Sequence, residues 1–125
     1  MKRILIAVLA AAPFVALPAN MDCSIKGKKT MSAARMKALA KVGATAARKA
    51  ALEKVGAPGA FIHRGGLEVE AGCLLYTYDV KVPGQKGYQE IFVDAGTGAV
   101  LKVDYESDAK ERAERILDKV KGAGR

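Results

Sequence analysis

The side chains that could carry out catalysis or hold a metal are few and far apart. His63 is the only histidine, and a zinc site usually draws together several His, Cys or carboxylate ligands. A serine hydrolase needs a histidine base and often has a Gly-x-Ser-x-Gly turn. This chain offers one possible base and has no such turn. There is no phosphate-binding loop either. The sequence therefore predicts no catalytic residue, no metal site and no cofactor, and His63 is interpreted as a strand-surface residue beside Arg64.

The two cysteines, Cys23 and Cys73, are too far apart to form a Cys-x-x-Cys redox motif. In an oxidising compartment they could form a disulfide. Closing so long a loop would stabilise the fold by roughly 4 kcal/mol in the loop-entropy model. The alternative is a buried Cys73 and a free Cys23 in the N-terminal tail.

The first 19 residues resemble a secretory signal peptide. Lys2 and Arg3 form a positive start, residues 4–17 are apolar, and Ala19 offers a small residue at a cleavage site. The alternative is an uncleaved anchor, but the apolar run is shorter than the ~20 residues that a membrane span needs. We therefore expect an exported protein, bacterial periplasmic or extracellular.

Basic residues account for a net charge of +8 and are concentrated in the first half of the chain. This early group of basic residues includes Lys26, Lys28, Lys29, Arg35, Lys37, Lys41, Arg48 and Lys49. They either form a solvated helix face or attract anionic lipids, envelope polymers or an acidic protein. Export and the lack of interleaved aromatic residues argue against nucleic acid as a partner.

The first half of the chain is expected to be helical after a flexible basic tail over residues 20–30. Thr30 or Ser32 can cap a helix over 31–40, and Thr45 can cap a second helix over 46–55. A single helix over 31–55 is the alternative, because an isolated glycine costs only about 1 kcal/mol.

Four strands are expected next. Residues 61–70 form a strand with a bulge or bend at Gly65 and Gly66, and residues 73–82 alternate between a polar and an apolar face. On the first of these strands Glu68 and Glu70 share a face, where we expect them to be solvated rather than to work as a catalytic pair.

The other two strands form a hairpin over residues 88–104, joined by an Asp-Ala-Gly-Thr-Gly turn. Asp94 can hydrogen-bond its own backbone, Thr97 belongs to the same turn, and Gly96 and Gly98 tolerate positive φ. Ser107 can then cap a C-terminal helix over 107–121. Short connections make the strands antiparallel, so the expected fold is α+β, with N-terminal helices packed on a curved sheet of about four strands.

Four segments together resemble a PepSY domain. Residues 46–57 resemble its opening helix, 66–70 and 75–80 its central strands, and 90–100 its signature "VDA-x-TG-x-V" hairpin. The match covers about residues 40–104.

The resemblance implies an exported or surface-exposed PepSY-like domain over residues 31–106. Members of the family occur in propeptides of secreted metalloproteases and are thought to inhibit or modulate peptidases. The family has no catalytic motif to transfer. Asp94, Gly96, Thr97 and Gly98 match its signature and are interpreted as turn-forming.

The expected function is therefore that of a non-enzymatic binding module. It would bind a peptidase or another envelope protein through the open face or an edge of its sheet. The rival expectation is a structural envelope protein held to anionic surfaces by its basic N-terminal region. The sequence identifies neither the partner nor the oligomeric state.

Overall fold

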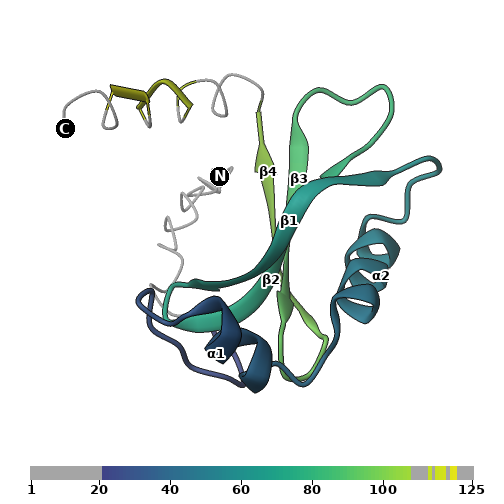
Figure 1. Ribbon diagram of the computed structural model, residues 1–125. Helices are drawn as coiled ribbons and strands as arrows, with labels where there is room; N and C mark the ends of the chain where they lie inside the picture. The colour runs from purple at the N-terminus through teal and green to yellow at the C-terminus, as the bar shows by residue number, and fades with distance from the viewer. Residues whose placement is uncertain (1–20, 108–112, 114, 118, 121–125) are drawn as a thin grey trace, which may run out of the picture.

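The computed structural model describes residues 21–107, 113, 115–117, 119 and 120. Two helices precede a four-stranded antiparallel sheet of order β1-β2-β3-β4, so the expected α+β class is confirmed (Figure 1). The elements are α1 Ala33–Leu39, α2 Ala44–Val55, β1 Phe61–Glu70, β2 Cys73–Lys81, β3 Tyr88–Asp94 and β4 Val100–Glu106. The expected signal peptide over 1–19 lies outside the described residues.

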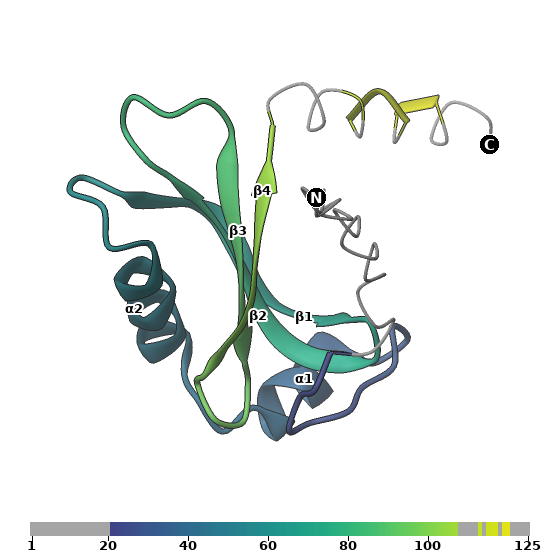
Figure 2. The ribbon, with the colours of Figure 1, turned by 180° about the vertical axis from the view of Figure 1, so that it is seen from behind.

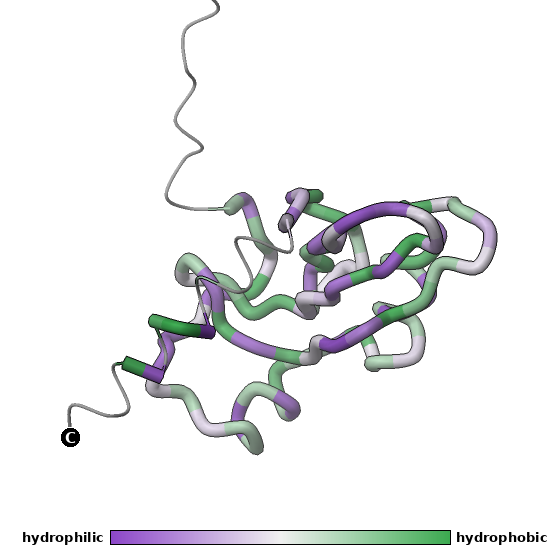
Figure 3. The backbone as a smooth tube through the Cα atoms, turned by 90° about the horizontal axis from the view of Figure 1, so that it is seen from above, coloured by the Kyte–Doolittle hydropathy of each residue, from purple (hydrophilic) through white to green (hydrophobic). Residues whose placement is uncertain are grey.

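Both helices contribute to one apolar cluster on the same face of the strongly curved sheet (Figure 2). Ala47 and Ala51 of α2 are fully buried, and their small side chains let the helix approach the strands closely. Hydrophobic and hydrophilic residues are interspersed along the chain (Figure 3), and β2, inside the sheet, is buried on both of its faces. The largest fully buried side chains of this helix-covered face are Tyr78, Leu74, Ile91, Val80 and Val93.

The helical region is broken into two helices. Ser32 caps α1 by accepting a hydrogen bond from the Arg35 N–H, and the chain turns extended at Ala40. The N–H groups of Lys41 and Val42 then both donate to the Ala95 carbonyl at 2.9 Å. These contacts with the end of β3 hold the linker out of a helical conformation, so the alternative of one helix over 31–55 is wrong.

The start of α2 differs from the expected one. Gly43, not Thr45, is the N-cap residue, and no side chain caps the helix there. The break is set by hydrogen bonds to the sheet, and Thr45 therefore falls inside the first turn.

The irregularity in β1 lies between Ile62 and Arg64, slightly before the expected Gly65 and Gly66. Gly65 is nevertheless required, because its φ is +138° and an added Cβ would lie 2.0 Å from the Thr77 carbonyl oxygen. Its backbone packs directly against Tyr78, its partner in β2. The glycine thus serves close approach between strands.

Of the C-terminal helix expected over 107–121, residues 113, 115–117, 119 and 120 are helical, whereas Ser107, the expected cap, is not. Ile116, Leu117 and Val120 are each more than half exposed. The rest of that helix, at 108–112, 114, 118 and 121, lies outside the described residues. Within the described part of the chain, no helix is both long enough and apolar enough to cross a membrane.

Candidate functional site

Asp94, at the end of β3, joins the β3–β4 turn to the N-terminal segment. Its carboxylate accepts hydrogen bonds from the backbone N–H groups of Gly96 and Thr97, at 2.7 and 3.1 Å. It also accepts from the backbone N–H and the hydroxyl of Ser24, at 2.8 and 2.5 Å. The residue therefore organises its own turn and also anchors a segment 70 positions earlier in the chain.

The environment of Asp94 favours its ionised form. Burial by itself raises the pKa of a carboxyl, but the hydrogen bonds from Ser24, Gly96 and Thr97 outweigh it and lower the pKa of Asp94 below its usual value. With all these donors supplied by the fold, the carboxylate acts as a structural anchor.

The two glycines of the turn have different roles. Both glycines were expected to tolerate a positive φ; Gly98 has a φ of +77°, whereas Gly96 is not among the residues with positive φ. A Cβ at Gly96 would instead lie 2.1 Å from the Ser24 hydroxyl. A side chain at Gly96 would therefore displace the Ser24 hydroxyl from its position beside Asp94.

The Cys23–Cys73 disulfide is present, with 5.9 Å between the Cα atoms, so the alternative of free cysteines is wrong. Beside it, the Leu74 N–H donates to the Ile25 carbonyl and the Gly27 N–H to the Gly72 carbonyl. Residues 23–27 thus lie along the start of β2, where β3 has already ended opposite Leu75. This part of the expected flexible tail is fixed to the sheet.

A pocket of about 570 Å³ lies between the two helices and β1. Gly65, Gly66 and Leu67 of β1 form one wall, and the buried Tyr76 and Tyr78 also line it. The helical side consists mainly of small and basic residues: Ala33, Met36, Lys37, Ala40, Lys41, Val42, Gly43, Ala44 and Arg48. Among the residues that the structure describes, no acidic one lines this pocket.

The tyrosines of the pocket hold the helix break in place. The Tyr76 hydroxyl donates to the Val42 carbonyl at 2.7 Å, and the Tyr78 hydroxyl donates to the Ala44 carbonyl at 3.5 Å. Burial raises the pKa of Tyr78, and Tyr76 raises it further, while Arg48 opposes both. Because its net pKa is raised, Tyr78 is a neutral phenol at neutral pH and is unsuited to act as a base.

The opposite face of the sheet is polar over much of its area. Arg64 Nε lies 2.5 Å from Asp79 Oδ2, and Thr77 donates a hydrogen bond to Glu68. Asp79, Glu90 and Glu106 place carboxylate oxygens within 4.8 Å of one another. Hard cations take such oxygen ligands, but here Arg64 already supplies a positive charge to Asp79. Three carboxylates beside an arginine do not by themselves define a metal site.

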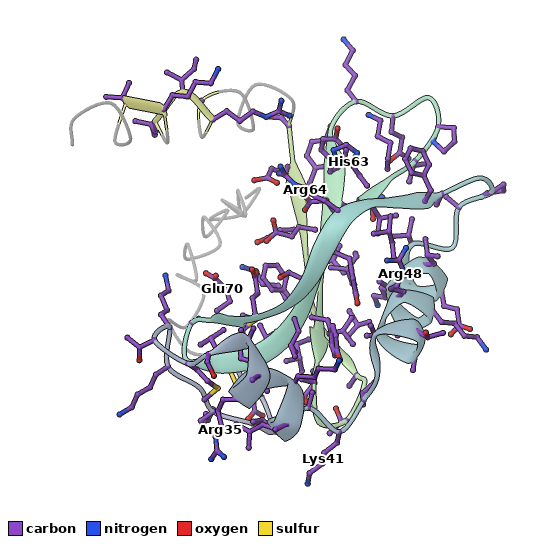
Figure 4. The ribbon with its side chains drawn as sticks, viewed as in Figure 1. Arg35, Lys41, Arg48, His63, Arg64 and Glu70 are labelled. Carbon is purple, nitrogen blue, oxygen red and sulfur yellow. A yellow bond between two sulfur atoms is a disulfide. The ribbon has the colours of Figure 1, made fainter. Side chains whose placement is uncertain are left out.

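His63 is exposed on the surface, and its ring stacks on that of Tyr88 with 4.8 Å between the centroids. Figure 4 shows it close to Arg64, as expected from the sequence. No described hydroxyl or thiol is hydrogen-bonded to His63, so it forms no nucleophile–base pair within that part of the chain. Glu68 and Glu70 are exposed, as expected.

Sequence reasoning missed three features: the pocket, the carboxylate cluster and the bond between Ser24 and Asp94. Each joins residues from elements that are distant in sequence. Asp79 of β2 and Glu90 of β3, for example, lie directly opposite each other only because of the register between the two strands. The charge of Arg48 was noted in the sequence, without any indication that it lines a pocket.

Comparison with known proteins finds no match: no family model, curated protein or solved structure is significantly similar to the chain. The resemblance to PepSY domains therefore stays a prediction from the sequence.

Proposed function

We propose that the protein is an exported, non-enzymatic binding module of the PepSY type. It inhibits or modulates a peptidase, or it binds another protein of the cell envelope. The observation that carries the proposal is the pocket of about 570 Å³ beside an edge strand of the sheet. A concave, partly apolar recess next to an unpaired strand edge suits a segment of a partner protein.

Two further observations support this proposal. The Cys23–Cys73 disulfide is compatible with an oxidising compartment, in agreement with the expected signal peptide at 1–19. The hairpin of β3 and β4 carries the Asp94–Gly98 turn through which the sequence resembles PepSY domains. Binding to such a module blocks a peptidase sterically and needs no reactive group on the module.

The proposal can be tested with peptidases secreted by the cells that produce this protein. The oxidised protein is added to the secreted fraction, and cleavage of a fluorescent casein substrate is followed. In parallel, a photo-crosslinking derivative captures partners from the intact envelope. We expect reduced casein cleavage or a crosslinked protein that is lost when the module is heat-unfolded. The absence of both effects, at micromolar concentrations of a module whose fold has been verified, would contradict a binding function.

The basic surface favours a second candidate function, attachment to an anionic envelope surface. The basic residues named above between Lys26 and Lys49 are all exposed. Attraction between exposed charges is screened beyond a Debye length of about 8 Å at physiological salt. Envelope association that disappears between 0.05 and about 1 M salt would favour this candidate, and salt-resistant association would exclude the purely electrostatic form.

A further inference from the structure

We propose that the pocket and the outer edge of β1 bind one extended, acidic peptide segment of the partner, which adds as a fifth strand to the sheet. This inference rests on the proposed binding function and specifies its site and ligand chemistry. The occupant is a polypeptide whose carboxylate side chains enter the pocket beside Arg48.

The position of the pocket on β1 is the first argument. In the described chain β1 pairs with β2 alone, so its other edge presents unpaired backbone groups. Gly65, Gly66 and Leu67 belong to this edge and also line the pocket. Side chains of a strand alternate between the two faces of a sheet. A strand added here would therefore direct every second side chain into the pocket.

The absence of bulky side chains at this edge is the second argument. A Cβ at Gly66 would meet no atom within 4 Å, so space is open beside it. Gly65 can carry no side chain, because an added Cβ would lie 2.7 Å from the Tyr78 Cα. Glycines in a strand often mark a place where another backbone approaches closely. This stretch therefore offers an incoming backbone little steric hindrance.

Charge complementarity selects the ligand. Within the described part of the chain, three cations, Lys37, Lys41 and Arg48, line the pocket and no carboxylate does. Arg48 leans from α2 toward β1, whereas Lys41 points outward (Figure 4). Arg48 therefore supplies the direct contact, because a guanidinium can hold a carboxylate by two parallel hydrogen bonds. The lysines raise the local positive potential.

The opposite face of β1 sets the pattern of the peptide. Glu68 and Glu70 lie on that face and are exposed, so they disfavour carboxylates in a strand bound beside them. Met36 and Leu67 give the pocket apolar wall area as well. The ligand is thus a segment with acidic and aliphatic residues directed to the helix side, and neutral residues between them.

The test measures fluorescence anisotropy with a labelled peptide in which glutamate and leucine alternate with threonine. The controls are a peptide with lysine in place of glutamate and vesicles containing phosphatidylglycerol. We expect Arg48→Glu to weaken binding of the acidic peptide about tenfold or more, because a charge-assisted bidentate contact is lost. The matched control is Lys49→Glu, which makes the same charge change on the same helix outside the pocket. It should weaken binding by less than about threefold.

Amide NMR shifts locate the peptide independently of charge. Saturating peptide should shift Gly65, Gly66 and Leu67 most, together with α1 and the start of α2. Shifts confined to the open face or to β4, or equal losses in both variants, would overturn the site. Binding to vesicles without binding to the acidic peptide would overturn the ligand class.

The outcomes also separate this inference from the proposed function. If Arg48→Glu still inhibits a peptidase or captures its partner undiminished, the module binds its partner elsewhere, and only the site is wrong. If the wild-type protein neither captures a partner nor binds peptide, both proposals fail. Concentration-dependent self-association that displaces the peptide would show that a second copy occupies β1, which also overturns the inference.

Discussion

The two faces of the sheet are held in different ways. On the helix-covered face, buried residues of α2, β1, β2 and β3 form one continuous apolar cluster, and partly buried residues of α1 and β4 pack against it. On the open face, the apolar cluster is small and contains Cys23, Cys73, Leu75 and Phe92, with Met21 and Leu101 packed against it. The disulfide and the Asp94 carboxylate hold the N-terminal segment against this small cluster. One face therefore depends on burial, and the other on a covalent bond and an ionised group that solvent conditions can change.

The same two faces differ in charge. Basic residues line the pocket on the helix side, whereas the polar face carries carboxylates from all four strands, among them Glu68, Asp79, Glu90 and Glu106. A partner that approaches β1 from its edge meets the positive potential of the pocket on one side and the negative potential of the carboxylates on the other. This difference gives a preferred orientation to a charged ligand, and orientation is what electrostatic complementarity mainly provides.

Among the substitutions that test how the two faces are held, removal of the disulfide should lower the stability of the protein most. Replacing both cysteines by alanine should lower the free energy of unfolding by about 4 kcal/mol, because the unfolded chain regains the freedom of a long loop. Urea unfolding of the oxidised wild type and the double variant measures this difference. A loss below about 1 kcal/mol would show that the hydrogen bonds of residues 24–27 suffice to hold the segment.

Adjacent leucines of β2 compare the faces directly. Leu74 and Leu75 are both fully buried, but on opposite faces. Each alanine substitution should cost about 3 kcal/mol in the oxidised protein. Without the disulfide, the stability lost on Leu75→Ala should fall by about 1 kcal/mol, because the N-terminal segment no longer packs firmly over Leu75. The stability lost on Leu74→Ala should stay the same. Equal changes at both positions would mean that the two clusters are one cooperative unit.

Asp94→Asn tests the ionised anchor. The variant should lose about 2 kcal/mol at neutral pH, because an amide cannot accept all the bonds from Ser24, Gly96 and Thr97.

The acid dependence of stability has a definite sign. The pKa of Asp94 is lower in the folded protein than in the unfolded chain, so its contribution is complete above the unfolded value, about 3.9, and is lost as the pH falls through the folded value. Melting curves between about pH 6 and 2 should therefore converge for the wild type and Asp94→Asn at the acid end. A constant gap at every pH would rule out ionisation as the cause.

Gly98→Ala should have the smallest effect. Its φ of +77° disfavours any side chain, so the substitution should cost about 1 kcal/mol. The matched control is Gly66→Ala, where the backbone is ordinary and a Cβ meets open space. That variant should change stability by less than about 0.5 kcal/mol in thermal melts. A larger loss at Gly66 would place the backbone constraint in β1 instead of in the β3–β4 turn.

Local patterns were sufficient for much of the fold. The alternation in β2 placed Leu74, Tyr76 and Tyr78 on the covered face, because side chains of a strand point alternately to its two sides. Ser32 was a recognisable helix cap for the same kind of reason. The errors fell at Thr45 and in the expected tail. Contacts with distant segments had overridden local preference at each of them.

The sequence by itself determined the α+β class, the succession of elements and the pairing partners of the disulfide, since two cysteines allow only one internal bond. The tertiary structure decided where the N-terminal segment lies, why the helices separate at residues 40–43, and that Arg48 borders a pocket beside β1. The physical reason is range. Periodicity and capping act within a few residues, whereas a pocket and its charge exist only once α1, α2 and β1 have packed together.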